Sequence, residues 1–229
     1  DFGICPEPSN SVLMPKLCGI LRGTITYTGT AGHTALLYEG KTCIQKACDA
    51  IEALYQLNSQ LIQRPVADNV PPPHLSIAVI NGGTAANVFP SKTTFWFDRR
   101  LIPGENHDQA LKEITDVLDQ LKEKDASYEY QINVTSRRPL LDVDFNDPCV
   151  ELIKRSYREI MGKDVKVAVG AGACDASWIQ KVVGTPMPFF GGAEDFAECA
   201  MAKPNERILL KTYYDFIKIY MMSVVNALS

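Results

Sequence analysis

Asp98 and Arg100 lie two positions apart in a run with strand character, so their side chains face the same side of the predicted strand. A guanidinium group can hold a carboxylate through two parallel hydrogen bonds, which makes Arg100 a candidate for binding a substrate carboxylate. Arg99 would face the opposite side and is the weaker candidate. The alternative is a surface ion pair between Asp98 and Arg100, an interaction that contributes little to stability.

Two further polar residues lie in glycine-containing loops. His33 follows a predicted strand in the run Gly29-Thr-Ala-Gly-His-Thr-Ala-Leu36, and a single histidine in such a loop is usually ordinary polar surface. Asn87 follows Gly82-Gly-Thr-Ala-Ala86, where a glycine turn leads into a strand and asparagine tolerates an unusual backbone angle. For both residues a structural and a functional interpretation remain open at this point.

The elements that must position these residues follow from the hydrophobic periodicity. Strands are predicted over residues 19–29, 74–81, 92–102 and 127–135, and helices over about 41–57 and 106–123. The order β-α-β-β-α-β is typical of a four-stranded antiparallel sheet with two helices on one face. The sequence therefore predicts an α+β fold in which residues 18–138 form one domain.

The flanking segments 1–17 and 139–229 predict a second, partial domain of α/β type. Asp147, Pro148 and Gly162 are typical of the N-cap, the first turn and the end of a helix. We then expect a strand at 165–169, a helix at about 175–182, a strand at 185–190 and a long helix from near Asn205. Alone, this part would expose sheet edges and apolar helix faces. The chain has no initiator methionine or signal-peptide pattern, and we expect it to be a piece of a longer protein.

Composition places few other limits on function. The chain is 46% hydrophobic and 22% charged with a formal net charge of -4, which fits a soluble globular protein and argues against nucleic acid or an anionic membrane as partner. No apolar run is long enough to span a bilayer. The seven cysteines form no C-x-x-C pair, which favours reduced, mostly buried thiols and a cytoplasmic location.

Three motifs together resemble one superfamily of metallopeptidases. They are Gly32-His33, the run Gly82-Gly-Thr-Ala-Ala-Asn-Val-Phe-Pro90 and the run Asp98-Arg-Arg-Leu-Ile-Pro-Gly-Glu105. The chain resembles the distal part of the acetylornithine deacetylase, succinyl-diaminopimelate desuccinylase, carboxypeptidase G and aminoacylase superfamily. The resemblance identifies 18–138 as the lid domain inserted into the catalytic domain. It implies a homodimer formed through a helix and an edge strand of that lid.

The resemblance also implies roles for individual residues. The lid histidine of the family polarises the scissile carbonyl, which makes His33 the catalytic candidate. Asn87 matches an asparagine that contacts substrate near the same carbonyl, and Arg100 would hold the substrate carboxylate. Asp175, in Gly172-Ala-Cys-Asp-Ala-Ser177, matches a loop near the substrate. Cys174 stands there where a hydroxyl residue is common, and without an identifiable base it is expected to be a loop or buried thiol.

The metal centre that the resemblance implies is incomplete in this sequence. Family members hold two zinc ions, and Glu7 in Pro6-Glu-Pro-Ser9 matches one ligand. Ala202 stands where the family has a metal-binding histidine, and the other ligands would lie upstream of Asp1. Zinc needs three or four N, O or S donors. Glu194, Asp195 and Glu198 are possible substitutes, although an acidic helix face is the better explanation for them.

Two functional hypotheses follow. The first is part of a zinc-dependent amidohydrolase acting on N-acyl amino acids or small peptides, expected to be inactive as this chain because ligands are missing; whether the chain is itself an enzyme stays open. The second is a non-enzymatic dimerisation or small-ligand binding module. Metal content and hydrolysis of N-acetyl amino acids with added zinc would discriminate them.

Overall fold

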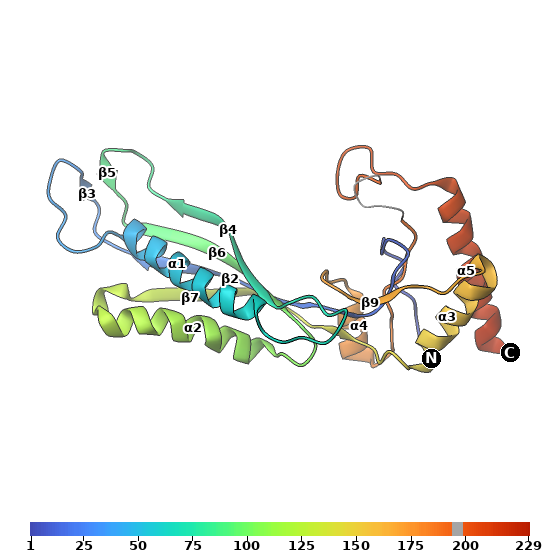
Figure 1. Ribbon diagram of the computed structural model, residues 1–229. Coiled ribbons are helices and arrows are strands. Elements are labelled where there is room, and N and C mark those ends of the chain that lie inside the picture. The colour runs from blue at the N-terminus through green and yellow to red at the C-terminus, as the bar shows by residue number, and fades with distance from the viewer. Residues whose placement is uncertain (194–198) are drawn as a thin grey trace. The chain divides into compact units, whose positions relative to one another are not determined.

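The structure is a computed structural model that describes residues 1–193 and 199–229 (Figure 1). The chain divides into two compact units. One, called here the sheet unit, comprises Gly19–Ala67 and Pro72–Arg138. The other, called the terminal unit, comprises Asp1–Cys18, Asp68–Pro71 and Pro139–Ser229.

The sheet unit is built on a four-stranded antiparallel sheet in the order β4-β6-β2-β7. Its strands and helices are β2 (Gly19–Thr28), α1 (Cys43–Ile62), β4 (His74–Gly82), β6 (Lys92–Leu101), α2 (His107–Lys124) and β7 (Tyr130–Arg138). The predicted α+β class, the element order and the antiparallel sheet are confirmed. The last strand begins later than predicted, because residues Ala126–Tyr128 form a 3-10 turn that the Asp125 side chain caps.

Helices α1 and α2 cover one face of this sheet (Figure 1). Inward-facing side chains of alternate strand positions, such as Ile25, Phe95 and Phe97, pack against Leu54 of α1 and Ile114 of α2 in one buried core. Helix α1 is fixed at its start by a capping box: Gln45 N–H donates to the Thr42 hydroxyl, and Thr42 N–H donates to the Gln45 side chain.

A short two-stranded ribbon extends from the end of the sheet at which β2 leaves and β6 enters. It pairs β3 (Gly32–His33) with β5 (Val88–Phe89) in antiparallel register, so that His33 lies opposite Val88. Figure 1 shows the ribbon as the blue and green loops at the far end of the sheet unit. The sequence did not predict it, because strands of two residues have no measurable periodicity. We call this ribbon and the loops on either side of it, residues 29–42 and 83–91, the tip.

The terminal unit contains a three-stranded sheet in the order β8-β1-β9, with β1 antiparallel to β8 and parallel to β9. Its elements are β1 (Leu13–Leu17), β8 (Leu141–Asp142), α3 (Pro148–Met161), β9 (Val167–Gly170), α4 (Ala176–Val183) and α5 (Leu210–Leu228). Helix α3 begins and ends as predicted: Asp147 accepts from Cys149 N–H, and Gly162 has a left-handed φ of 67°.

Two predictions in the terminal unit are wrong. No strand forms over 185–190; only Phe189 makes isolated bridges, with Cys5 and Met14. Pro186 and Pro188 lack the N–H groups that a paired strand needs. The last helix begins at Leu210 rather than near Asn205. Asn205 has a φ of 66°, which a right-handed helix cannot include.

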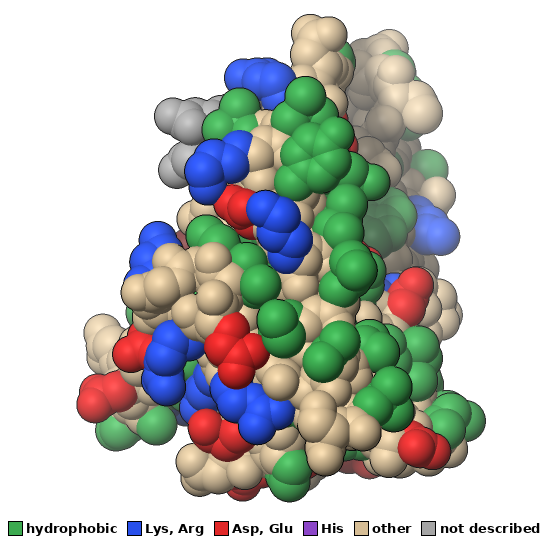
Figure 2. Space-filling model, turned by 90° about the vertical axis from the view of Figure 1, so that its right-hand side faces the viewer, with side chains coloured by type: hydrophobic (Ala, Val, Ile, Leu, Met, Phe, Trp, Pro, Cys, Tyr) green, Lys and Arg blue, Asp and Glu red, His purple; other side chains and the backbone are tan. Residues whose placement is uncertain are grey.

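Helix α5 carries a large exposed apolar surface. Phe216 and Ile219 are buried against the core of the terminal unit. Several large apolar side chains of the same helix are exposed: Leu210, Tyr213, Tyr214, Met221, Val224, Val225 and Leu228. Figure 2 shows hydrophobic side chains gathered on the face of the molecule that lies toward α5 in Figure 1.

None of the helices in the described part of the chain is both long enough and apolar enough to cross a lipid bilayer.

Candidate functional site

His33 is exposed at the tip, and one ring nitrogen is held by the backbone. The Ala35 N–H donates to His33 Nδ1 at 3.1 Å. Because Nδ1 accepts, the neutral imidazole carries its proton on Nε2. No described residue bonds Nε2. The ring is therefore oriented so that its N–H donor is available to a molecule outside the loop.

Asn87 lies beside His33 in the ribbon. The Thr34 N–H donates to the Asn87 carbonyl oxygen at 3.0 Å, and Asn87 precedes Val88, the pairing partner of His33. Gly83, which has a φ of 82°, makes the turn before this segment. The structure thus brings together two of the residues predicted from the sequence, both with exposed side chains.

The loop after His33 is anchored by Tyr38. Its ring packs edge-on against Phe89 with centroids 4.9 Å apart, and its hydroxyl oxygen accepts from Thr30 N–H at 3.0 Å. Between the loop and the ribbon lies a hollow of about 300 Å³ that His33, Leu37, Tyr38 and Phe89 help to line. The sequence analysis did not identify Tyr38 as part of the site, and an isolated aromatic residue offers no pattern by which to find it.

Arg100 lies near the opposite end of the sheet, on the face away from the helices. Its Nε donates to Asp98 Oδ1 at 2.7 Å, and Arg22 Nε donates to Asp98 Oδ2 at 2.5 Å. Asp98 is therefore shared by two arginines, and the ion pair considered from the sequence is present. Arg100 pairs in register with Ile20 and His74, whereas His33 lies in the separate ribbon at the tip.

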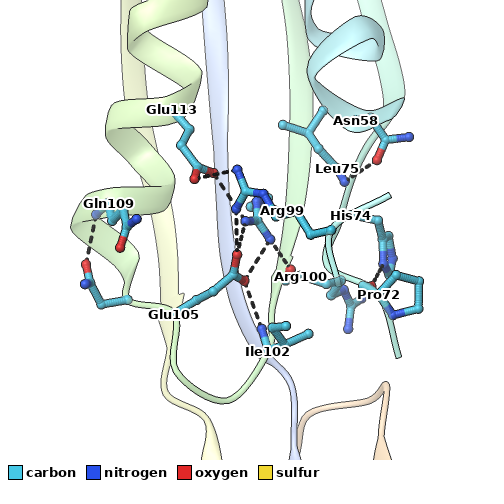
Figure 3. A network of polar contacts seen from close by, with 12 residues as sticks. Asn58, Pro72, His74, Leu75, Arg99, Arg100, Ile102, Glu105, Gln109 and Glu113 are labelled. Atoms are coloured by element: carbon cyan, nitrogen blue, oxygen red, sulfur yellow. Dashed lines mark hydrogen bonds and ion pairs between the residues drawn. The ribbon is translucent and has the colours of Figure 1, made fainter. Parts of the chain in front are cut away.

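Arg99 faces the other way and is fully buried (Figure 3). Its Nη2 donates to Glu105 at 2.6 Å and to Glu113 at 3.3 Å. Arg64 pairs with the same two glutamates, and Glu105 also accepts from Ile102 N–H at 3.0 Å. The network fastens the turn after β6 to helix α2. Arg99 is thus a structural residue, and burial leaves it no access to a ligand.

Glu7 belongs to the terminal unit and lies in a segment held against residues 186–191. Ser9 Oγ donates to the Gly191 carbonyl at 2.8 Å and accepts from Gly191 N–H at 3.0 Å. A Cβ atom at Gly191 would come within 2.1 Å of the Glu7 carbonyl oxygen. Glycine is required there by close approach of two backbones, and the Glu7 side chain remains exposed.

Cys5 and Cys174 are in contact in the same unit. Their sulfur atoms are 3.8 Å apart and both side chains are buried. The hydrogen bond between them lowers the pKa of Cys5 and raises the pKa of Cys174, because a thiolate at one position is stabilised by the S–H group of the other. Glu7 and Asp175 both act electrostatically on Cys5. The seven cysteines all lie in the described residues and form no disulfide with one another; six of them are buried, and Cys48 is exposed.

The described residues do not fit the zinc centre that the resemblance implies. Over residues 1–193 and 199–229, no three His, Cys, Asp or Glu side chains converge into a group that could hold a metal ion. Glu194, Asp195 and Glu198 lie outside the described residues. Ala202 is exposed with a φ of 57°, and its N–H donates to Glu206 at 3.3 Å.

A family model matches the region that carries the tip and the sheet. Residues 16–126 match the peptidase dimerisation domain. The predicted recognition is thereby confirmed, and this domain contains His33, Asn87 and Arg100 but neither Glu7 nor Asp175.

The chain is also similar in sequence to curated proteins and in fold to a solved structure. The chain is 26% identical to a succinyl-diaminopimelate desuccinylase of Magnetococcus marinus over 79% of this chain and 47% of the relative. It is also 26% identical to a succinyl-diaminopimelate desuccinylase of Maricaulis maris, over 96% of this chain and 55% of the relative. A tripeptidase from Staphylococcus aureus matches with a TM-score of 0.75 at 18% identity, covering 100% of this chain and 58% of that chain. This chain spans about half the length of these curated relatives.

Proposed function

We propose that this chain contributes the carbonyl-orienting lid of an amidohydrolase that acts on N-acyl amino acids or small peptides. The observation that carries this proposal is the bond from Ala35 N–H to His33 Nδ1, which leaves Nε2–H as a donor at the tip. A fixed donor is suited to an amide oxygen that gains negative charge during hydrolysis. The desuccinylase names of the relatives support the same reaction class.

The remaining candidate residues take positioning roles in this proposal. Asn87 would contact the same carbonyl from the neighbouring position in the ribbon. Arg100 would hold a substrate carboxylate, with Asp98 keeping its guanidinium oriented. Because Arg100 and His33 lie toward opposite ends of the sheet, they would act on one substrate across the proposed homodimer, with His33 supplied by the second copy. Asp175, in a loop that resembles the family's substrate loop, is proposed as a further substrate contact. Glu7 is proposed as a metal ligand, although it needs partners that the described residues do not supply.

Hydrolysis assays test this function directly. The chain, with and without added zinc, is incubated with N-acetyl amino acids and small peptides, and its metal content is measured by mass spectrometry. Turnover that is lost in His33→Ala but retained in Leu210→Ala, a change at an exposed leucine of α5, supports the proposal. Turnover that is detectable in the wild-type chain and equal in all three proteins refutes the role of His33.

The alternative function is a non-enzymatic dimerisation or small-ligand binding module. The observation that favours it is the edge of the sheet. Strand β4 is an edge strand on which Val79 and Ile80 are 44% and 48% exposed. A long edge with apolar side chains is a site for pairing with another chain. In either function we propose a homodimer formed through this edge and the adjoining helix α1, as the name of the domain implies.

The homodimer has its own test. Analytical ultracentrifugation should find a dimer, and Ile80→Lys should convert it to monomer because a charge on the edge opposes pairing. Lys112→Glu on the exposed face of α2 serves as a control. A monomeric wild-type chain, or a dimeric Ile80→Lys variant, would contradict this interface. Dimerisation without bound metal and without turnover would favour the alternative function.

A further inference from the structure

The loop between β3 and α1 presents two leucines with largely exposed side chains. Leu36 is 70% exposed and Leu37 is 100% exposed. The loop itself is well fixed, because Leu36 N–H donates to the His33 carbonyl at 3.0 Å and Tyr38 is held by Phe89 and by Thr30 N–H. Exposed leucines on an anchored loop form a preformed apolar surface, which is a common property of ligand sites.

These leucines border the hollow of about 300 Å³ that also contains the His33 side chain. Phe89 and Tyr38 form its other apolar walls. A group bound to Nε2 of His33 would therefore have an apolar surface immediately beside it. The hollow adjoins the position that the proposed function assigns to the substrate carbonyl.

The charge of the hollow limits what it can bind. The described residues that line it include no Lys or Arg, and Glu39 is the one acidic residue among them. A ligand carboxylate placed there would have no cation to pair with and would be repelled by Glu39. An uncharged hydrocarbon group would instead remove the leucine side chains from water.

From these observations we propose that the tip hollow is an acyl subsite selective for uncharged, apolar acyl groups, with Leu36 and Leu37 as its specificity-determining residues. This inference rests on the proposed function, because it places an acyl amide at His33. It distinguishes this chain from the two desuccinylases that it resembles, whose names specify a succinyl group, which carries a carboxylate.

Two ligands of similar length test the inference: N-pentanoyl-L-alanine and N-succinyl-L-alanine. Binding to the whole chain is measured by calorimetry and by the methyl NMR resonances of Leu36 and Leu37. We expect the pentanoyl compound to shift both methyl pairs and to bind at least about tenfold more tightly, since a few buried methylene groups are worth this much. The succinyl compound should gain about fivefold in affinity in Glu39→Gln, because repulsion is removed.

Variants at the surface separate a subsite from general apolar binding. The double variant Leu36→Ser, Leu37→Ser should weaken the pentanoyl compound about tenfold. The matched control is Leu210→Ser in α5, a leucine that is also 70% exposed, which should leave the affinity unchanged. Folding should be unaffected in both variants, because the replaced side chains make few contacts, and thermal unfolding checks this.

The inference is overturned if the succinyl compound binds equally or more tightly, if the double variant binds the pentanoyl compound normally, or if neither compound binds at its solubility limit. Methyl shifts that depend on protein concentration without ligand would assign the leucines to contacts between copies and also overturn it. Selective binding without hydrolysis would retain the subsite and reject the proposed function. Hydrolysis of both compounds at equal kcat/KM would retain the proposed function and reject the subsite.

Discussion

The two ends of the sheet unit use polar side chains in opposite ways. We call the end of the sheet away from the tip, where β6 leads into α2, the base. There Arg99 is buried and bonded to Glu105 and Glu113, which also bind Arg64. At the tip, His33 has one nitrogen held by the backbone and the other exposed. The base pairs its charges within the unit, with Arg99 Nε left as a buried donor without a partner, whereas the tip leaves a donor and two leucines exposed. Polar residues that the fold does not need for its own stability are the better candidates for function.

The largest expected effect is at the base. Arg99→Met should lower the free energy of unfolding by about 3–5 kcal/mol. The reason is that two partly buried glutamates lose the guanidinium of Arg99, whose side chain is 0% exposed. Chemical denaturation monitored by Trp96 fluorescence would measure it. A loss below about 1 kcal/mol would show that the network is no more than a surface ion-pair cluster, and the contrast between the two ends would fail.

A comparable loss, but in activity rather than stability, is expected at the tip. His33→Ala should reduce kcat by about 10²–10³-fold in the hydrolysis that we propose, as removal of an oxyanion donor does. Its free energy of unfolding should change by less than about 0.5 kcal/mol, since the side chain is exposed. Parallel kinetic and thermal measurements would show this separation. Destabilisation as large as that of the Arg99 variant would give His33 a structural role instead.

A smaller effect is expected where α1 packs on the turn before β7. Asp49 accepts from Lys41 at 2.6 Å and from the Tyr128 hydroxyl. The hydrogen bond from Lys41 and, to a smaller extent, that from Tyr128 hold the pKa of Asp49 below its usual value of 3.8. A lowered pKa stabilises the fold above the usual value, and this contribution is lost as pH falls through the folded-state pKa.

Asp49→Asn should therefore cost roughly 0.5–1 kcal/mol at pH 7, discounted because both charged side chains are more than one third exposed. The difference from wild type should begin to shrink as the pH falls toward and below 3.8, the usual value for the group, and should vanish only below the lowered folded-state pKa. Denaturation curves at neutral and acid pH would reveal it. A difference that is independent of pH would attribute the loss to packing rather than to charge.

The smallest effect is expected on the outer face of the sheet. Arg22 pairs with Asp98 at 2.5 Å with its side chain 48% exposed, and such pairs contribute about 0–1 kcal/mol. Arg22→Met should change stability by less than about 0.5 kcal/mol, so comparison with Arg99→Met isolates the effect of burial on one kind of ion pair. Equal losses in the two variants would remove that distinction.

Much of the sheet unit could be predicted because its elements are long and amphipathic. Alternate positions such as Phe95, Phe97 and Arg99 face inward along β6, and that periodicity is visible in the sequence. Arg99 shows the limit of this reasoning, since a buried arginine requires partners on α2 that no local pattern indicates. The ribbon that fixes His33 was missed for the same reason, because its pairing joins short segments that are distant in sequence.

The terminal unit was less predictable because its packing depends on close approaches between distant segments. The contact of Cys5 with Cys174 spans 169 positions, and no motif indicated it. The predicted strand over 185–190 failed because alternating prolines removed the donors, although its residues do lie beside the N-terminal segment. Apolar composition predicted that the segment is packed, but not the form of its hydrogen bonding.

Gly191 determines how results from this unit must be interpreted. Its φ is not left-handed, yet even a single methyl group there would overlap the Glu7 carbonyl oxygen. Routine alanine scanning would consequently report Gly191 as an essential residue. The defect would originate in the displaced Pro6–Ser9 segment and in the carboxylate that it carries. An inactive Gly191→Ala protein would thus test whether activity depends on the position of Glu7, without a change to the glutamate itself.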